Sequence, residues 1–432
     1  MSAMERMSLH MPNANVVLAA RFRRRLQTQD VERALPALCQ RHPMAAVRVE
    51  QHESNQAAFT TWGVALPPVE ESGELDMLAA ISEEHRTPFS WPEGPLMRFR
   101  LIPDGKDRTI CLITAHHATC DGLSLFYVLR DLADWIETGG FSSPRPSPIA
   151  IRTAAPPLRT SWGERTMMKL LSRKWRRKGI TFSAKDTARL HEAFWSGHRS
   201  HALAGRLTRE ETRGFAEACR TQSVTVGNAL TSACIAAQAE TQPGSPIAGT
   251  TLVSVSLRDR LNPPVGDALG FYATGVRVPY RHVTGRSPWT SARSFGQELD
   301  KLLTTENLLA LRRLELLDPG LIDALAFARG GLCTDPLAQK LLTRSGKDRV
   351  IAGLLMANLG RLTSSTQDVP AHLDAIYGPF VCSDTTEKYM AAATVAGRLH
   401  VSLSYDEAVL DVQTADAFFE LVMKKLRRFG IR

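Results

Sequence analysis

The chain has 432 residues, of which 44% are hydrophobic and 22% are charged, a balance typical of a folded, water-soluble protein. This length exceeds that of one ordinary domain and fits two lobes. The formal net charge of +9 favours an anionic partner, either a phosphate-bearing cofactor or an acidic carrier protein. Nucleic acid is not the expected partner, because the sequence has neither zinc-finger spacing nor an aromatic-rich RNA motif.

No apolar run reaches about 18 residues, so we expect no transmembrane helix. At the N-terminus a short apolar patch precedes the arginines, the reverse of a secretory signal, and we expect a cytoplasmic protein. The seven cysteines are scattered and never form a CxxC pair. This pattern predicts reduced core thiols, with neither disulfides nor a bound metal.

Strands and helices are predicted to mix along the first part of the chain. Predicted strands cover residues 15–24, 45–50, 58–63, 97–102 and 110–115. Predicted helices cover residues 31–40, with Asp30 as the cap, residues 75–86, and a segment that begins at Leu123. Pro43 cannot continue a helix, so we expect the first one to end at Arg41-His42-Pro43.

The composition changes after this part of the chain. Residues 139–160 are rich in proline and have little periodicity, which predicts a surface linker or crossover. We therefore expect one lobe over residues 1–180 and a second over residues 181–432. Residues 162–178 form a basic amphipathic helix, with Met167, Met168, Leu171 and Trp175 on one face. Contact with a membrane surface or an anionic ligand is one interpretation, and a solvated helix packed by its apolar stripe is the favoured one.

The second lobe is predicted to combine a mixed sheet with flanking helices. Predicted elements are a strand from His198, helices over 208–220 and from Thr225, a strand over 248–256, a helical region over 288–312, strands over 350–357, 388–396 and 399–404, and a helix over 412–428. The elements follow no strict βαβ order, and no repeat of 20 to 50 residues is visible.

The stretch Thr109–Ile136 carries the strongest chemical signal. A short apolar strand leads to His116 and His117, and a turn with Asp121 and Gly122 precedes the next helix. Adjacent residues of a strand point to opposite faces, so one histidine is expected to face a cleft and the other the core. Gly122 permits a tight turn or a close backbone approach.

Several interpretations of this turn remain open from the residues alone. One histidine is a general base, since imidazole titrates near neutral pH. Alternatively, His116, His117, Cys120 and Asp121 bind a metal, or both histidines are structural, or Cys120 is a nucleophile. The His191-Glu192 pair does not begin an HExxH metalloprotease motif, because Trp195 stands where the second histidine is required.

The string from His116 to Gly122 matches HHxxxDG and resembles the signature of the acyltransferase superfamily. This superfamily includes chloramphenicol acetyltransferase, the plant BAHD enzymes, polyketide-associated acyltransferases and peptide-synthetase condensation domains. Further similar segments are Arg41-His42-Pro43, Pro88-Phe89, Gly94-Pro95-Leu96, the run from Leu257 to Pro264, Gly270-Phe271, and the run from Met356 to Gly360. The resemblance covers about residues 8 to 410.

The resemblance implies two α/β lobes, each like a chloramphenicol acetyltransferase subunit, with an active-site tunnel at their interface. It implies that His117 is the general base and that His116 packs. Asp121 is then expected to point away from the cleft and to pair with Arg258, or alternatively with Arg260. Gly122 is expected to leave room for the thioester arm.

Some segments depart from the patterns of the relatives. The DFGWG stretch of BAHD enzymes is absent, and Tyr377-Gly378-Pro379-Phe380 is a loose echo of it, which favours a bacterial type of enzyme. Residues 270–274 read GFYAT where condensation domains often have GxFVN, which makes peptide-bond formation less expected. Asn358 and Thr274 are candidates for oxyanion or substrate contacts, and the alternative is that local hydrogen bonds satisfy them.

The function implied by the resemblance is acyl transfer from a thioester donor to a hydroxyl or amine of a small molecule. Acyl-CoA or a phosphopantetheinyl carrier protein is the expected co-substrate, with no bound cofactor. One alternative is a standalone condensation-type enzyme that joins two carrier-bound substrates, with the carrier acting in trans. Another is a non-catalytic relative that binds a thioester or a partner protein. A monomer is expected.

Overall fold

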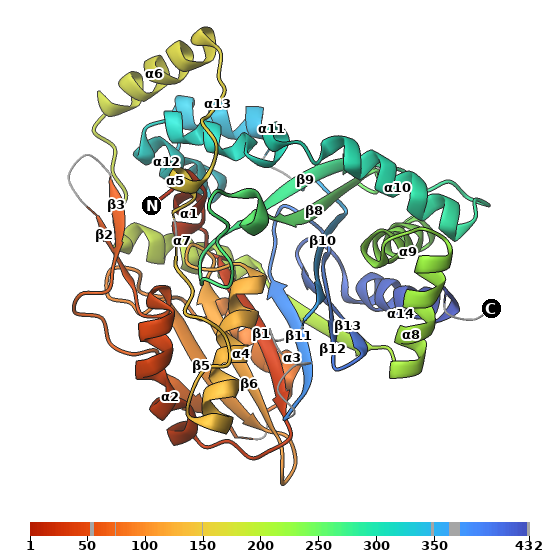
Figure 1. Cartoon of the computed structure of the whole chain (residues 1–432). Helices are drawn as coiled ribbons and strands as arrows, with labels where there is room; N and C mark the ends of the chain where they lie inside the picture. The colour runs from red at the N-terminus through yellow and green to blue at the C-terminus, as the bar shows by residue number, and fades with distance from the viewer. Residues whose placement is uncertain (52–55, 74, 149, 347–349, 363–371, 430–432) are drawn as a thin grey trace.

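The computed structural model describes residues 1–51, 56–73, 75–148, 150–346, 350–362 and 372–429. Two sheets dominate these residues (Figure 1). The five-stranded sheet has the order β11(Leu373–Val381), β1(Asn15–Phe22), β6(Thr109–His116), β5(Met97–Pro103), β4(Val69–Glu71). The six-stranded sheet has the order β7(Ser200–Arg206), β13(Arg398–Asp406), β12(Tyr389–Val395), β10(Leu354–Arg361), β8(Thr250–Ser256), β9(Ala273–Pro279). A small hairpin pairs β2(Arg48–Gln51) with β3(Ala57–Thr60).

The five-stranded sheet is covered on both faces, because apolar residues alternate between two clusters along β1. Val16, Leu18 and Ala20 pack with α2(Thr28–Arg41) and α4(Gly122–Thr138). Val17 and Ala19 pack on the other side with α3(Met77–Arg86). A strand buried on both faces reads as one continuous apolar run, and the run in residues 16–20 is of this kind.

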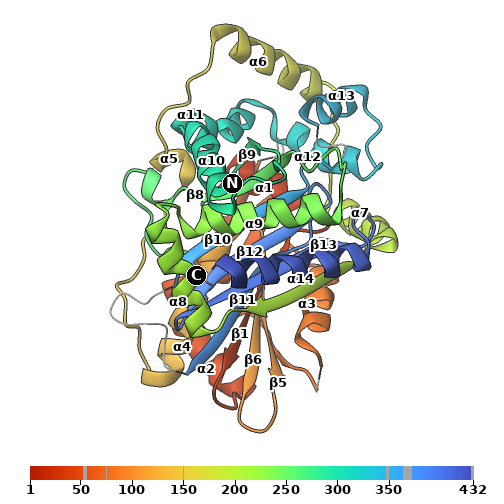
Figure 2. The same ribbon diagram turned by 90° about the vertical axis from the view of Figure 1, so that its right-hand side faces the viewer.

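The six-stranded sheet carries its own helical layer. α8(Arg209–Thr221), α9(Val226–Thr241), α10(Pro288–Leu302) and α14(Val412–Phe429) share its main apolar cluster. Figure 2 shows α9 and α14 lying side by side across this sheet. The structure therefore confirms the expected fold class of mixed sheets with flanking helices.

A third group of helices surrounds the N-terminal helix. It contains α1(Ala3–Leu9), α6(Trp162–Arg176), α7(Ala184–Gly197), α12(Pro319–Arg329) and α13(Pro336–Ser345), whereas the short α5(Ile151–Ala154) and α11(Thr305–Leu308) pack on the cluster of the six-stranded sheet. The short 3₁₀ segments are Pro43–Ala45, Arg258–Arg260 and Ala310–Leu316. A buried ion pair, 2.6 Å between Arg6 Nη2 and Asp323 Oδ2, joins α1 to α12. The N-terminal helix thus packs against a helix from the second half of the chain.

The boundary expected at residue 180 does not separate the two sheets. β11 belongs to the second part of the chain, yet it pairs antiparallel with β1 at the edge of the five-stranded sheet. Val16 lies opposite Val381 and Ala20 lies opposite Ile376. The first sheet is therefore completed by a strand from residues 373–381, a segment for which the sequence predicted no strand.

Several predicted element ends were wrong. Gln27, not Asp30, caps α2, and the Asp30 carboxylate accepts a hydrogen bond from the Gln27 amide at 2.9 Å. β10 continues through Asn358 to Arg361, and the helical region over 288–312 is broken after Leu302. The linker contains α5, and α7 was not predicted; residue 149 of the linker lies outside the described residues.

Candidate active site

The HHxxxDG turn lies where β6 meets α4, between two buried elements. β6 is flanked by β1 and β5, and all of its residues are buried. The strand ends at His116, which lies opposite Asn15. α4 begins at Gly122, one residue before the predicted start, because the Asp121 carboxylate accepts a hydrogen bond from the Ser124 amide at 2.8 Å and caps the helix.

His117 is held in one tautomer by the turn itself. Its Nδ1 lies 2.8 Å from the carbonyl oxygen of Cys120, which only accepts, so Nδ1 carries the proton. The other ring nitrogen, Nε2, is left with its lone pair. The backbone amide of His117 donates to the carbonyl of Ala14 at 2.7 Å, and the ring lies 4.6 Å from that of Phe271.

Burial lowers the pKa of His117 below its ordinary value of 6.5. The hydrogen bond to Cys120 and the charge of Asp121 offset part of this effect. A neutral imidazole with a free Nε2 is therefore the form present at neutral pH. This is the form that can accept a proton.

His116 has a different environment. Its Nδ1 accepts a hydrogen bond from the Ala118 amide at 3.2 Å, and burial lowers its pKa to about 3. It also lines a cavity of about 410 Å³ together with Phe89, Trp91 and residues of α7. The ring is thus a buried neutral group, and His116 rather than His117 lines this cavity.

Asp121 pairs with Arg258, the first of its two predicted partners. Arg258 Nη2 lies 3.2 Å from Asp121 Oδ1, and both side chains are buried. The other carboxylate oxygen accepts from the Tyr272 amide at 2.9 Å. Arg260, the alternative partner, is exposed. The carboxylate is therefore fully engaged in holding the turn against the segment between β8 and β9.

Ser124 is part of the same connection, and the sequence did not single it out. Its hydroxyl donates to the Gly270 carbonyl at 2.6 Å and accepts from Arg258 Nη2 at 2.7 Å. Arg258 Nη1 donates to the carbonyls of Gly266 and Ala268 at 2.7 and 2.8 Å. The only available signal was the position of Ser124, three residues after an aspartate that begins a helix.

Gly122 does not leave open space, contrary to the expectation of room for a thioester arm. A Cβ at this position would lie 2.5 Å from Pro379 Cγ and 3.3 Å from a methyl of Leu359. The missing side chain is therefore used for close packing against β11 and β10. Pro379 belongs to the Tyr377–Phe380 segment, so this segment contacts the HHxxxDG turn directly.

The two oxyanion candidates lie in unlike environments. Asn358 is exposed, and its Oδ1 accepts from the Gly360 amide at 3.0 Å. Thr274 is buried on β9 opposite Val255, and its hydroxyl has no hydrogen-bond partner among the described residues. Neither side chain hydrogen-bonds to His117 in the described part of the chain.

Two further side chains near the turn keep their protons. Burial, with the charge of Asp121, raises the pKa of the Cys120 thiol well above its ordinary value. The same two causes raise the pKa of Tyr389 on β12. Cys120 is therefore a protonated core thiol, unlike a nucleophile, and within the described residues no group of three His, Cys, Asp or Glu side chains is arranged to hold a metal.

The Arg41-His42-Pro43 segment is hydrogen-bonded to α4 through Asp131. Arg41 Nε donates to the Asp131 carboxylate, and His42 Nε2 lies 2.8 Å from the same group. Arg130 Nη2 donates to the other oxygen of Asp131 at 2.7 Å. Burial alone raises the pKa of Asp131, but the hydrogen bonds from His42 and Arg41 and the charge of Arg130 lower it overall. This segment therefore fixes the helix that begins at the turn.

Two family models match the chain. Residues 3–147 match the condensation domain, and residues 197–301 match the C-terminal part of phthiocerol/phthiodiolone dimycocerosyl transferase. Both matches are consistent with the CoA-dependent acyltransferase superfamily, which the HHxxxDG string resembles. The matches indicate a transferase of the condensation and acyltransferase type, as the resemblance implied.

Curated relatives match only part of this chain. Malpinin synthetase of Mortierella alpina is 30% identical over 151 residues, which are 33% of this chain and 2% of that protein. Phosphinothricin tripeptide synthetase PhsC of Streptomyces viridochromogenes is 28% identical over 178 residues, which are 39% of this chain and 16% of that protein. The chain thus spans a small share of these relatives.

Solved structures share the fold over the whole chain. The first condensation domain of the calcium-dependent antibiotic synthetase matches with a TM-score of 0.64 and 12% identity, covering 100% of this chain and 95% of that one. Polyketide synthase associated protein 5 from Mycobacterium tuberculosis matches with a TM-score of 0.59 and 15% identity, covering 100% of this chain and 96% of that one. At these identities the likeness concerns the fold.

Proposed function

We propose that the protein transfers an acyl group from a thioester donor to a hydroxyl or amine of a small molecule, with His117 as the general base. The observation that carries the proposal is the 2.8 Å contact between His117 Nδ1 and the Cys120 carbonyl. It leaves Nε2 as a proton acceptor, and burial keeps the ring neutral.

In the proposed reaction, the acceptor O–H or N–H lies against His117 Nε2. The acceptor atom attacks the thioester carbonyl as its proton passes to Nε2. The tetrahedral intermediate then collapses, the carbon–sulfur bond breaks, and the leaving thiolate takes the proton back from the imidazolium. Donor and acceptor held at one imidazole gain the proximity advantage of a bound pair.

Other residues of the site are proposed to hold the turn in place or to contact the substrate. Asp121 and Arg258 hold the turn, and the buried Thr274 hydroxyl, which lacks a partner among the described residues, is the better candidate donor for the oxyanion. The exposed Asn358 remains a candidate for substrate contact. The donor is acyl-CoA or an acyl carrier protein in trans, and the protein is proposed to be a cytoplasmic monomer without a bound cofactor.

A second candidate function is a condensation-type enzyme that joins two carrier-bound substrates. The match of residues 3–147 to the condensation domain favours it. The third candidate, a non-catalytic binder of a thioester or a partner protein, is disfavoured because the described geometry keeps His117 in the tautomer of a base.

The test is thioester consumption by wild-type protein and His117→Ala. Acyl-CoA and acyl-phosphopantetheinyl carrier protein are each incubated with hydroxyl and amine acceptors, free or bound to a second carrier protein, and release of free thiol and formation of product are measured. We expect His117→Ala to lower the rate by about 10²–10⁴-fold, the usual contribution of a general base. Equal rates for both proteins would refute the role of His117, and product formed only from two carrier-bound substrates would establish the condensation reaction.

A further inference from the structure

The two long sides of α6 have unlike surroundings. Trp175 and Ser172 face the protein with 1% and 4% of their surface exposed, and they pack on the cluster formed by α12 and its neighbours. Met168 and Leu171 pack on the same cluster. Met167 was predicted to share this inner face, but it is 49% exposed and lies outside it.

Polar contacts fix the inner side of the helix to the body. Arg176 Nε lies 3.3 Å from the Asp318 carboxylate, and Arg313 Nε lies 3.4 Å from that of Glu164. The Asp318 amide donates to the Ser172 hydroxyl at 2.9 Å. α6 is therefore anchored at both ends, and its outer side is presented in a defined orientation.

The outer side of α6 exposes large apolar side chains. Trp162 is 82% exposed and Leu170 is 61% exposed. Eight residues separate them, a little over two helical turns, so they lie on the same side of the helix. An indole and a leucine held in water on one side of an anchored helix mark a contact surface.

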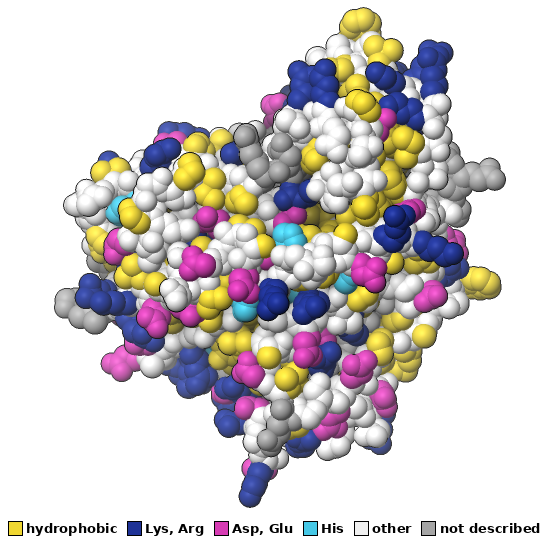
Figure 3. Space-filling view, turned by 180° about the vertical axis from the view of Figure 1, so that it is seen from behind, with side chains coloured by type: hydrophobic (Ala, Val, Ile, Leu, Met, Phe, Trp, Pro, Cys, Tyr) yellow, Lys and Arg dark blue, Asp and Glu magenta, His cyan; other side chains and the backbone are white. Residues whose placement is uncertain are grey.

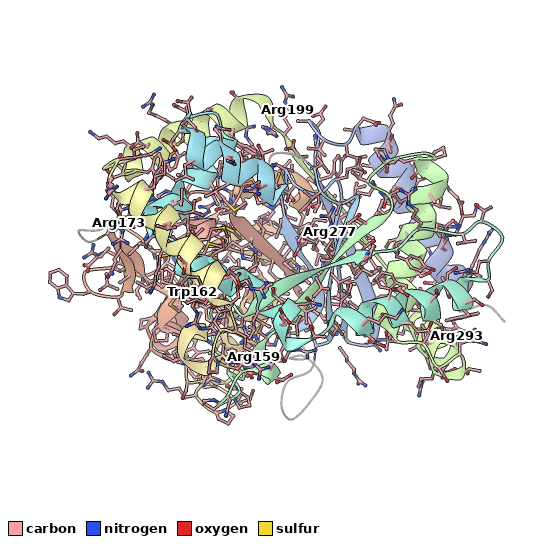
Figure 4. All side chains as sticks on the ribbon, turned by 90° about the horizontal axis from the view of Figure 1, so that it is seen from above. Arg159, Trp162, Arg173, Arg199, Arg277 and Arg293 are labelled. Carbon is pink, nitrogen blue, oxygen red and sulfur yellow. The ribbon has the colours of Figure 1, made fainter. Side chains whose placement is uncertain are left out.

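Basic side chains are interleaved with these apolar ones. Lys169 and Arg173 are exposed on the same side, and within the described residues neither has an ion-pair partner. The charged residues of α6 are Glu164, Arg165, Lys169, Arg173, Lys174 and Arg176. The net charge of the helix is therefore strongly positive. In Figure 4, Trp162 and Arg173 are labelled on α6, and Arg159 lies in the segment that precedes this helix.

α6 also forms the projecting end of the molecule (Figures 1 and 2). In the space-filling view this end carries hydrophobic and basic side chains side by side (Figure 3). A projecting helix can reach a flat surface without obstruction from the rest of the chain. None of the described helices is long and apolar enough to cross a membrane, so any lipid contact of these residues is at the bilayer surface.

We infer that the outer face of α6, defined by Trp162, Lys169, Leu170 and Arg173, docks on an anionic lipid surface. Tryptophan and leucine would enter the headgroup region, where an indole is accommodated well, and the basic side chains would contact lipid phosphates. The charge of the helix is complementary to such a surface. This inference does not rest on the proposed acyl transfer.

The experiment measures sedimentation of the full chain with vesicles of phosphatidylcholine alone or mixed with phosphatidylglycerol. Wild-type protein is expected to bind the anionic vesicles and to lose this binding at high salt. Trp162→Ser with Leu170→Ser is expected to weaken binding at least about tenfold, because two interfacial apolar groups are removed. Lys169→Glu with Arg173→Glu is expected to weaken it by a similar factor.

Matched controls test whether α6 itself is responsible. Trp62, which is 79% exposed and lies outside α6, is replaced by serine, and the exposed Arg213 and Arg220 on α8 are both replaced by glutamate. Both controls are expected to bind as wild type does. Circular dichroism confirms that each variant is folded.

Three outcomes would overturn the inference. Wild-type protein could fail to bind anionic vesicles, or it could bind neutral vesicles equally well. The control variants could also lose as much binding as the α6 variants. If the α6 substitutions instead abolish binding to an acidic carrier protein while no vesicle binding occurs, the face is a protein-docking surface. Acyl transfer is assayed separately in solution without vesicles. Failure of the lipid-docking proposal can therefore be distinguished from failure of the proposed acyl transfer.

Discussion

Arg258 Nη2 lies 3.2 Å from Asp121 Oδ1, although 137 positions separate the two residues along the chain. This pair ties the HHxxxDG turn to the segment that precedes β9. Both side chains are buried, so removal of either partner leaves a charge without its counterion in the interior.

Asp121→Ala is expected to lower the free energy of unfolding by about 3–5 kcal/mol, the usual cost of breaking a buried ion pair. Urea denaturation followed by circular dichroism measures the change. Arg260→Ala is the control, because this exposed arginine lies two positions after Arg258 and does not pair with Asp121 in the described structure. Its effect on the free energy of unfolding is expected to stay within about 0.5 kcal/mol. An Asp121→Ala protein as stable as wild type would show that the pair does not hold the turn.

Gly122→Ala is expected to destabilise the protein by about 1–3 kcal/mol, because the new Cβ would lie 2.5 Å from Pro379 Cγ. Gly163→Ala provides the contrast, since that glycine also lies in the first turn of a helix and a Cβ there would meet nothing within 4 Å. Thermal denaturation compares the two, and Gly163→Ala is expected to be neutral or stabilising. Equal effects would refute the close contact with β11.

The pH dependence of kcat/KM should report the lowered pKa of His117. The base acts only when it is neutral, so activity is retained as pH falls until it reaches the lowered pKa, and is lost below it. The acid limb of the profile is therefore expected below pH 6.5, the ordinary value for histidine.

The Phe271→Ser variant tests whether burial causes the lowered pKa of His117. The centre of the Phe271 ring lies 4.6 Å from that of His117, so this side chain covers part of the imidazole. Its loss is expected to weaken desolvation and to move the acid limb upward, toward pH 6.5. A limb at or above 6.5 in the wild-type enzyme, or no movement in the variant, would contradict burial as the cause.

Cys120→Ala is expected to keep activity within about threefold of wild type, because the contact to His117 uses the backbone carbonyl of residue 120. The buried, protonated thiol is expected to resist iodoacetamide in the folded protein. Steady-state rates and mass spectrometry of the treated protein measure both effects. Loss of activity in a folded Cys120→Ala protein, with rapid alkylation of wild type at this position, would support a nucleophilic cysteine instead.

Much of the site could be predicted because it is local in sequence. The strand, the paired histidines and the capped helix start lie within residues 109–136, and short-range hydrogen bonds build the turn. The choice of Arg258 over Arg260 came from the resemblance, and the structure brings Arg258 to Asp121. What the sequence did not predict was the Ser124 hydroxyl, whose partners lie around residue 270.

The sequence by itself determined the mixed α/β elements, the acyltransferase resemblance and the turn with two histidines between a strand and a helix, since apolar periodicity, caps and turns act over a few residues. Only the tertiary structure decided that β11 completes the first sheet, that Pro379 fills the space at Gly122, and that α6 turns Met167 outward. Pairing partners and contact faces depend on segments hundreds of residues apart. Local patterns carry no information about which strand edge or helix face a distant segment will meet.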